Sequence, residues 1–273
     1  DVYWKENYIY NELHFSPFHI SLDTIDKYVD RLNKESIRYF HAYPSAIINL
    51  MHAMKEKNLK LSYSPKAIFL ISENYSIEQV QELDDFFSCK MMSFYGHSER
   101  LIFAPTFGDM MTFKHDKRYG FCELVNEQGE VINSDNITGE LVGTSYDNWM
   151  MPLIRYKTDD YSKYYNSKSA IFTQLEGRWK QEKLIGKNDE EITLTALNMH
   201  SKIFANVLNY QYQQIQKGIV KICLIPGKSY SENDKQAILD AFDSKAGHAV
   251  EFSIEIVDRM QLTSRGKFQR LIK

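Results

Sequence analysis

The chain has 273 residues, of which 43% are hydrophobic, and a net charge of −3. That length and composition allow a large core and suggest about two domains. Its 33 basic and 36 acidic side chains give no electrostatic case for binding nucleic acid or an anionic membrane. No apolar run approaches the ~18 residues that a membrane helix needs, so we expect no membrane partner.

Glycine and cysteine exclude further classes of protein. The first of the 12 glycines is Gly96, and their wide spacing leaves no Walker loop, no G-x-G-x-x-G and no G-x-S-x-G. The three cysteines are scattered without a C-x-x-C pair, which is typical of reduced thiols in a cytoplasmic protein. We therefore expect a cytoplasmic location and no zinc.

The first half of the chain alternates between helical and strand patterns. Apolar residues recur at helical spacing, then form short continuous runs of strand length. The predicted elements are helices over 25–32, from Pro44 and from Ser76, and strands over 67–71 and 90–94. Such alternation predicts an α/β region with a partly parallel sheet.

Near residue 121 the predicted secondary structure changes from alternating helices and strands to short strands. Short strands joined by polar turns are predicted over 121–125, 130–132, 139–144, 153–156 and 170–175, as in a small antiparallel barrel or sheet. After Gly177, a strand over 219–225, a helix over 231–246 and an alternating strand over 250–256 predict a separate α+β unit. We therefore expect domains at 1–176 and 177–273, with a hinge near 177–186.

Four ordered segments carry a family resemblance. They are Tyr95-Gly96-His97-Ser98-Glu99, residues 152–160, Glu176-Gly177-Arg178 and residues 262–267. Their order and spacing resemble the adenylate-forming enzymes. Further matches at Tyr43-Pro44-Ser45, Ile71-Ser72-Glu73 and Leu197-Asn198-Met199-His200 resemble the phenylacetate-CoA ligase group and its CapK-type relatives in capsular polysaccharide synthesis. The resemblance covers essentially the whole chain, as a large-domain portion followed by a small lid domain.

The first segment suits a nucleotide. An aromatic ring such as Tyr95 offers a flat face to adenine, and Glu99 offers the hard oxygen that Mg²⁺ prefers beside phosphates. The resemblance implies those two roles, and it assigns the α-phosphate contact to Ser98. The alternative is a plain strand-to-loop turn in which the tyrosine packs and the glutamate is solvated. By resemblance the other predicted residues are Gly96, Ser72 and Glu73 at the nucleotide, and His97 and Tyr43 at the substrate pocket; for His97, filling space is the alternative.

The ribose and the reacting phosphate have their own candidates. The carboxylate of Asp160 could accept both hydrogen bonds from a ribose diol, and Arg178 could donate to the same sugar; the resemblance implies both roles. The family usually has Thr-Gly-Asp where this chain has Thr158-Asp159-Asp160. That departure adds a negative charge, and an exposed charged turn is the alternative reading.

Lys267 is the predicted catalytic cation. It follows a glycine on a basic tail, and a positioned ammonium stabilises the negative charge that gathers when a carboxylate attacks the α-phosphate. The resemblance implies that this lysine lies on the mobile lid domain. Gln261 replaces the usual proline, and a solvated tail lysine is the alternative.

The predicted function is ATP-dependent activation of a small-molecule carboxylate, with Mg²⁺ and with coenzyme A as a candidate acceptor. Two alternatives stay open, namely a non-catalytic AMP-binding homologue and an adenylyltransferase that acts on a hydroxyl. The family binds the outer phosphates of ATP with a Ser/Thr/Gly-rich loop, which has no counterpart before Tyr95. We therefore expect a C-terminal portion that is inactive without the N-terminal part of the same protein.

Overall fold

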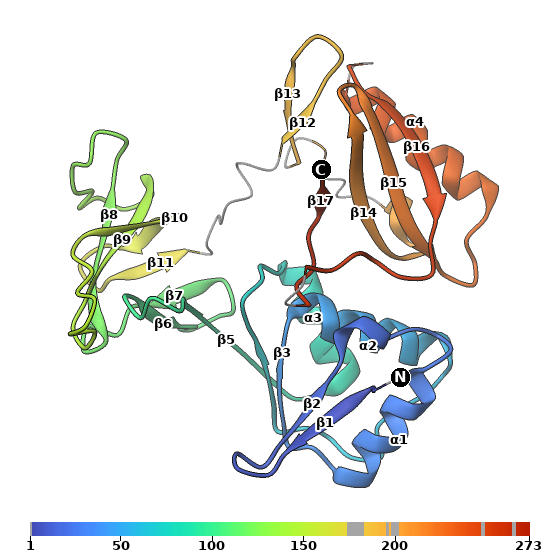
Figure 1. Ribbon diagram of the computed structural model, residues 1–273, viewed down its shortest axis with the longest axis horizontal. Coiled ribbons are helices and arrows are strands. Elements are labelled where there is room, and N and C mark those ends of the chain that lie inside the picture. The colour runs from blue at the N-terminus through green and yellow to red at the C-terminus, as the bar shows by residue number, and fades with distance from the viewer. Residues whose placement is uncertain (1, 174–182, 195–196, 198–201, 247–248, 264–265) are drawn as a thin grey trace. The chain divides into compact units, whose positions relative to one another are not determined.

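The structure is a computed structural model that describes residues 2–173, 183–194, 197, 202–246, 249–263 and 266–273 (Figure 1). By internal contacts the chain divides into two compact units. One unit holds residues 38–44 and 64–179, and the other holds residues 1–37, 45–63 and 180–273. The predicted boundary at 176/177 lies outside the described residues and stays a prediction. No helix in the described part of the chain is long and apolar enough to cross a membrane.

A four-stranded sheet begins the first of these units. Its order is β3 (Tyr39–Ala42), β4 (Ala67–Leu70), β5 (Lys90–Gly96) and β6 (Phe103–Pro105). The first three strands run parallel, and β6 is antiparallel to β5. The predicted partly parallel sheet is confirmed.

Helix α3 (Ile77–Phe87) connects β4 to β5. The Ser76 hydroxyl accepts the backbone N–H of Gln79, and the Gln79 side chain accepts the backbone N–H of Ser76, which completes a capping box. Val80, Leu83 and Phe87 form the buried face of the helix. This helix was predicted from the same residues.

A five-stranded antiparallel sheet completes this unit. Its order is β7 (Thr112–Lys114), β11 (Ile171–Thr173), β10 (Tyr156–Asn166), β9 (Thr138–Ser145) and β8 (Gly120–Val125). A Cβ on Gly143 would lie 2.6 Å from Leu101 Cβ. Strand β9 therefore packs against the segment at Leu101 closely enough to require glycine at position 143. In the described residues the strand order runs from β7 to β8 without closing on itself, which matches the sheet among the two forms expected, and Phe113 of β7 also bridges to Thr106 after β6.

Two predicted strands of this region were wrong. Residues 130–132 form only the single bridge between Val125 and Val131, and residues 153–155 are a loop that precedes β10. Each stretch makes single backbone hydrogen bonds, such as Ile132 N–H to Leu124 O and Ser145 N–H to Leu153 O, but neither forms a continuous ladder, although their side chains have strand-like composition.

The other unit contains a hairpin and two helices from the N-terminal part of the chain. The hairpin pairs β1 (Trp4–Asn7) with β2 (Glu12–Phe15), and a short 3₁₀ helix, η1 (Pro17–His19), follows. Helix α1 (Ile25–Glu35) buries Ile25, Tyr28, Val29 and Leu32, the face that was predicted. Helix α2 (Pro44–Glu56) begins with proline, which needs no N–H partner there.

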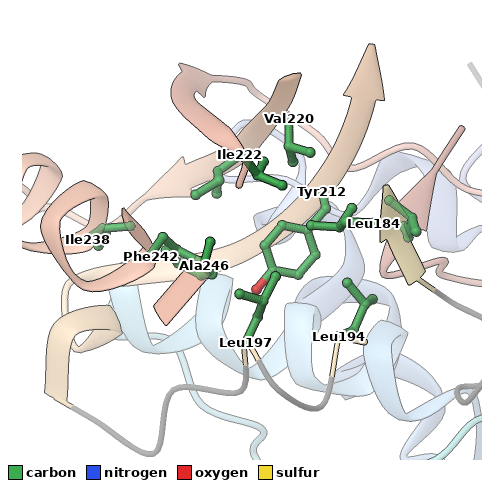
Figure 2. Packing of buried hydrophobic residues seen from close by; sticks show 11 residues of the cluster. Leu184, Leu194, Leu197, Tyr212, Val220, Ile222, Ile238, Phe242 and Ala246 are labelled. Atoms are coloured by element: carbon green, nitrogen blue, oxygen red, sulfur yellow. The ribbon is translucent and has the colours of Figure 1, made fainter. Parts of the chain in front are cut away.

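The same unit contains the C-terminal α+β structure. Its elements are β12 (Lys183–Ile185), β13 (Glu191–Thr193), η3 (Lys202–Phe204), β14 (Val207–Gln216), β15 (Ile219–Pro226), α4 (Glu232–Ala246), β16 (Glu251–Ile256) and β17 (Leu271–Ile272). The sheet order is β16-β15-β14-β17, and α4 packs on β16. Figure 2 shows the core between helix and sheet, where Tyr212, Ile222 and Phe242 are buried together. The predicted α+β class is confirmed.

Candidate functional site

The carboxyl ends of three parallel strands lie at one edge of the β3-β4-β5 sheet. Ala42 of β3 and Ser93 of β5 both pair with Leu70 of β4, so β3 and β4 end at the same level, and β5 continues three residues further to Gly96. Ligands of open α/β sheets bind in the crevice outside such strand ends. The predicted residues found there are Tyr43 after β3, Ser72 and Glu73 after β4, and Tyr95, Gly96 and His97 at the end of β5.

Tyr95 and Asp160 form the central contact of this edge. The Tyr95 hydroxyl donates to Asp160 Oδ2 over 2.9 Å, although 64 residues separate the two in the chain. Tyr95 is only 9% exposed. Burial, and then the negative charge of Asp160, raise the pKa of Tyr95, so the phenol stays protonated and remains a donor. The contact fixes the direction of the carboxylate.

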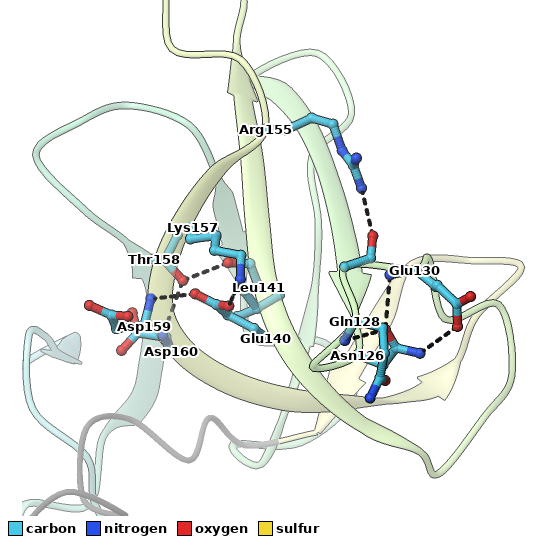
Figure 3. Close-up of polar contacts among 11 residues, drawn as sticks. Asn126, Gln128, Glu130, Glu140, Leu141, Arg155, Lys157, Thr158, Asp159 and Asp160 are labelled. Atoms are coloured by element: carbon cyan, nitrogen blue, oxygen red, sulfur yellow. Dashed lines mark hydrogen bonds and ion pairs between the residues drawn. The ribbon is translucent and has the colours of Figure 1, made fainter.

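A bulge in β10 presents Asp160 (Figure 3). The pairing of β10 with β9 is interrupted between Lys157 and Tyr161. Inside this gap the buried Thr158 hydroxyl donates to Leu141 O over 2.8 Å and accepts the Asp160 N–H over 3.2 Å. Bulges re-aim side chains beside functional sites, and here the Thr158 hydroxyl bonds both the neighbouring strand and the backbone of Asp160, two residues further on.

Asp159 occupies the left-handed region within the bulge. Its φ is +59°, and its N–H donates to Oε1 of the buried Glu140 over 3.2 Å. Lys157 Nζ lies 3.4 Å from the other oxygen of Glu140. Residues other than glycine adopt positive φ only at a cost, and aspartate is among those that tolerate it best. This conformation explains why a glycine position can accept an aspartate here.

We expect Asp159→Gly to raise the free energy of unfolding by roughly 0.5–1 kcal/mol, because relief of left-handed strain exceeds the added freedom of the unfolded chain. Urea denaturation measures it. The matched control is Asp258→Gly at an exposed position with negative φ, which should lose stability. An Asp159→Gly protein less stable than the parent would show that the bulge carries no such strain.

His97 and Glu99 follow the end of β5. The His97 ring stands edge-on to the Tyr95 ring at 5.7 Å, and its Nδ1 lies 3.4 Å from Glu99 Oε2. Both ring nitrogens are buried and lack a well-aligned hydrogen bond within the described residues. Burial lowers the pKa of His97, and the charge of Glu99 opposes that shift. Ser98 is exposed in the turn between them.

Lys267 lies in the other compact unit, on a short hairpin. Leu262 and Phe268 form an isolated antiparallel bridge. Inside it the Thr263 N–H donates to Lys267 O over 2.9 Å, and the Lys267 N–H donates to Thr263 Oγ1 over 3.0 Å. The predicted tail lysine is therefore held in a turn. Arg178, the other predicted ribose contact, lies outside the described residues.

Comparisons with known proteins show what this chain is similar to. Residues 184–273 match the family described as the CapK C-terminal domain. The protein CapK of Staphylococcus aureus is 24% identical over 279 residues, a match that covers 97% of this chain. The resemblance to the CapK group is thereby confirmed. The chain spans 59% of the length of that relative.

The fold of this chain is similar to that of solved adenylate-forming CoA ligases. A 2-hydroxyisobutyryl-CoA ligase in complex with 2-HIB-AMP superposes with a TM-score of 0.70 at 13% identity, over 91% of this chain and 57% of that one. A benzoate CoA ligase from Burkholderia xenovorans LB400 gives 0.58 at 16% identity, over 90% of this chain and 53% of that one. The chain has the fold of the C-terminal part of these enzymes.

The carboxylates at this edge of the sheet suit a metal ion that is held jointly by the protein and by substrate phosphates, rather than one held by protein ligands alone. No group of three potential metal ligands occurs among the residues that the structure describes. Mg²⁺ is commonly held by one or two carboxylates together with substrate phosphates. Glu99, 39% exposed in the turn after β5, fits such a metal.

Two residues of the site were missed by sequence reasoning. Thr158 was quoted within a motif without a role of its own, and Glu140 was not singled out. The available signal for Glu140 was a charged residue inside an otherwise apolar strand, between Gly139 and Leu141. A buried carboxylate needs partners, and here these are Lys157 and the Asp159 N–H.

Proposed function

We propose that the protein containing this chain activates a small-molecule carboxylate with ATP to give an acyl-adenylate and pyrophosphate, then transfers the acyl group to a thiol such as coenzyme A. One observation carries the proposal: a carboxylate, Asp160, is held by the buried Tyr95 hydroxyl beside the ends of three parallel strands. A ligase with this fold supports it, since solved structures of 2-hydroxyisobutyryl-CoA ligase contain 2-HIB-AMP, and one contains CoA as well.

The nucleotide lies along this edge in our proposal. Asp160 accepts the ribose hydroxyls, because an ionised carboxylate offers about four lone-pair sites and the Tyr95 hydroxyl uses one of them. Tyr95 borders the adenine, and the exposed Ser98 reaches the α-phosphate. The remaining contacts in the proposal come from Gly96, Ser72 and Glu73 at the edge, and from Arg178.

The acyl group lies next to His97 and Tyr43. The His97 Nε2 is buried without a hydrogen-bond partner in the described part of the chain, and such an atom is costly unless a ligand or water satisfies it. A substrate carboxylate would supply that partner. Glu99 holds Mg²⁺, which neutralises phosphate charge when it is bound.

Asp160→Ala is expected to weaken AMP binding by the full-length protein about 10- to 100-fold, the range of a hydrogen bond made to a charged group. Isothermal titration calorimetry measures the dissociation constant. Asp159→Asn is the matched control, because it removes the neighbouring exposed carboxylate and should leave the affinity equal or higher. Unchanged affinity in Asp160→Ala would remove Asp160 from the nucleotide site.

Departures from the family pattern favour one other function, and an adenylyltransferase that acts on a hydroxyl is a separate alternative. Asp159 and Gln261 stand where the family has glycine and proline, as a degenerate AMP-binding homologue could have. The positive φ of Asp159 argues that the bulge keeps its shape, which supports the catalytic function. AMP binding without pyrophosphate exchange would indicate the degenerate homologue, and a stable AMP ester in mass spectrometry would indicate an adenylyltransferase.

The setting of the reaction is part of the same proposal. We place it in the cytoplasm, where ATP and coenzyme A are available, with residues 1–176 as part of the large domain and 177–273 as hinge and lid. The remainder of the protein supplies the loop for the outer phosphates. A capsular polysaccharide role follows only from the relationship to CapK.

A further inference from the structure

Gln211 is a buried amide whose partners all lie on one distant segment. It belongs to β14, and 1% of it is exposed. Oε1 accepts the Gln261 N–H over 3.1 Å, while Nε2 donates to Gln261 O over 2.9 Å and to Gln269 O over 2.6 Å. Its orientation follows from these partners, because only the amide oxygen can accept an N–H and only the amide nitrogen can donate to carbonyls.

These partners are the two arms of the hairpin that carries Lys267. Gln261 precedes the Leu262–Phe268 bridge and Gln269 follows it, so one side chain joins both arms to β14. After the hairpin, the Tyr212 N–H donates to Arg270 O over 2.8 Å, and Tyr212 pairs with Leu271 of β17. Tyr212 is the next residue after Gln211, so two adjacent residues of β14 anchor the hairpin and the strand after it.

The tip of the hairpin is equally constrained. Gly266 has φ +77°, and a Cβ there would lie 2.9 Å from Pro17 Cγ. Lys267 is the next residue, and its N–H and C=O both bond Thr263. The backbone of Lys267 is thus fixed by contacts at the tip and at the base.

We propose that Gln211 is a positioning residue for Lys267: its buried amide clamps both arms of the hairpin and so fixes where the catalytic ammonium is presented. The inference rests on the proposed function, because Lys267 acts only in adenylation. Displacement of a positioned group by about 1 Å can cost 10²-fold in rate. The clamp accounts for a polar side chain of β14 that is buried on the sheet face opposite Tyr212.

The test uses Gln211→Met in the full-length protein, since methionine keeps a similar volume but leaves an N–H and two carbonyls without their partner. Hydrogen exchange of the amides in 261–269 should quicken about tenfold or more, as expected for lost buried hydrogen bonds. The kcat of pyrophosphate exchange should fall by about tenfold, with the KM for ATP nearly unchanged. Gln211→Glu, which keeps the acceptor alone, provides the same readouts if the methionine variant does not fold.

Two controls separate positioning from general loss of stability. Gln214, also on β14, accepts the Ile185 N–H and donates to Ile185 O over 3.0 and 2.8 Å. Gln214→Met should lose stability without quickening exchange in 261–269. In a Lys267→Ala background, Gln211→Met should add no further loss of kcat, because the group that it positions is gone.

Unchanged hydrogen exchange in 261–269 would overturn the clamp. Additive losses in the double variant would overturn its action through Lys267. A full-length protein without any exchange activity, but with faster hydrogen exchange in Gln211→Met, would refute the proposed function and leave the clamp supported.

Discussion

Replacing Lys267 by alanine is expected to slow carboxylate-dependent ATP–pyrophosphate exchange by the full-length protein about 10²- to 10³-fold, which corresponds to roughly 3–4 kcal/mol of transition-state stabilisation. Attack on the α-phosphate gathers negative charge on the phosphoryl oxygens and the leaving pyrophosphate. The hairpin of residues 262–268 fixes the Lys267 backbone before the reaction, so little reorganisation is needed when that charge develops.

The control for this variant is Lys273→Ala, an exposed lysine of the same basic tail. It removes the same charge from the chain but not from the hairpin, so exchange should stay within about twofold of the parent. Equal losses in the two variants would mean that the tail acts through its general charge. Full activity in Lys267→Ala would contradict the assigned mechanism.

Phe242→Ala should lower the free energy of unfolding by about 3–5 kcal/mol, the usual cost of deleting a fully buried aromatic side chain. Phe242 on α4 is completely buried. Its ring centroid lies 5.2 Å from that of Phe252, 5.7 Å from Tyr212 and 6.1 Å from Phe204. It therefore contacts both the sheet and η3, and no single neighbour can fill its volume.

Chemical denaturation followed by circular dichroism measures this loss. Ile256→Ala is the matched control, because Ile256 lies on the adjacent β16 and is 51% exposed, and it should cost less than about 1 kcal/mol. A loss below 1 kcal/mol in Phe242→Ala would mean that the core between α4 and the sheet is not packed as described.

Elements with local signals were predicted well. Helix α3 follows from the capping box of Ser76 and Gln79, and α1 from four apolar residues at helical spacing. Strand β16 follows from strict alternation in 251–256. In each case most of the residues that create the pattern also make the contacts, so the sequence alone contains the reason.

The first residues of β10 could not be predicted in this way. Thr158, Asp159 and Asp160 are polar, and their composition favours an exposed turn. Their bulge within β10 depends on partners distant in sequence: Leu141 O for the Thr158 hydroxyl and Glu140 for the Asp159 N–H. Propensity is overridden where such non-local hydrogen bonds form.

The candidate site likewise has parts that the sequence predicts and parts that only the fold reveals. The identities of Tyr95, Glu99 and Asp160 came from motifs, but the bond between Tyr95 and Asp160 required the fold. Gln211 carries no motif at all. Its role depends on two segments that lie 50 and 58 residues further along the chain, and nothing near it in sequence points to them.

Exchange of labelled pyrophosphate into ATP by the full-length protein, with and without a panel of small carboxylates, tests the proposed adenylation most directly. We expect exchange that depends on both Mg²⁺ and one class of carboxylate, and that is abolished by chelation of the metal. Tight AMP binding with no exchange for any carboxylate would contradict it.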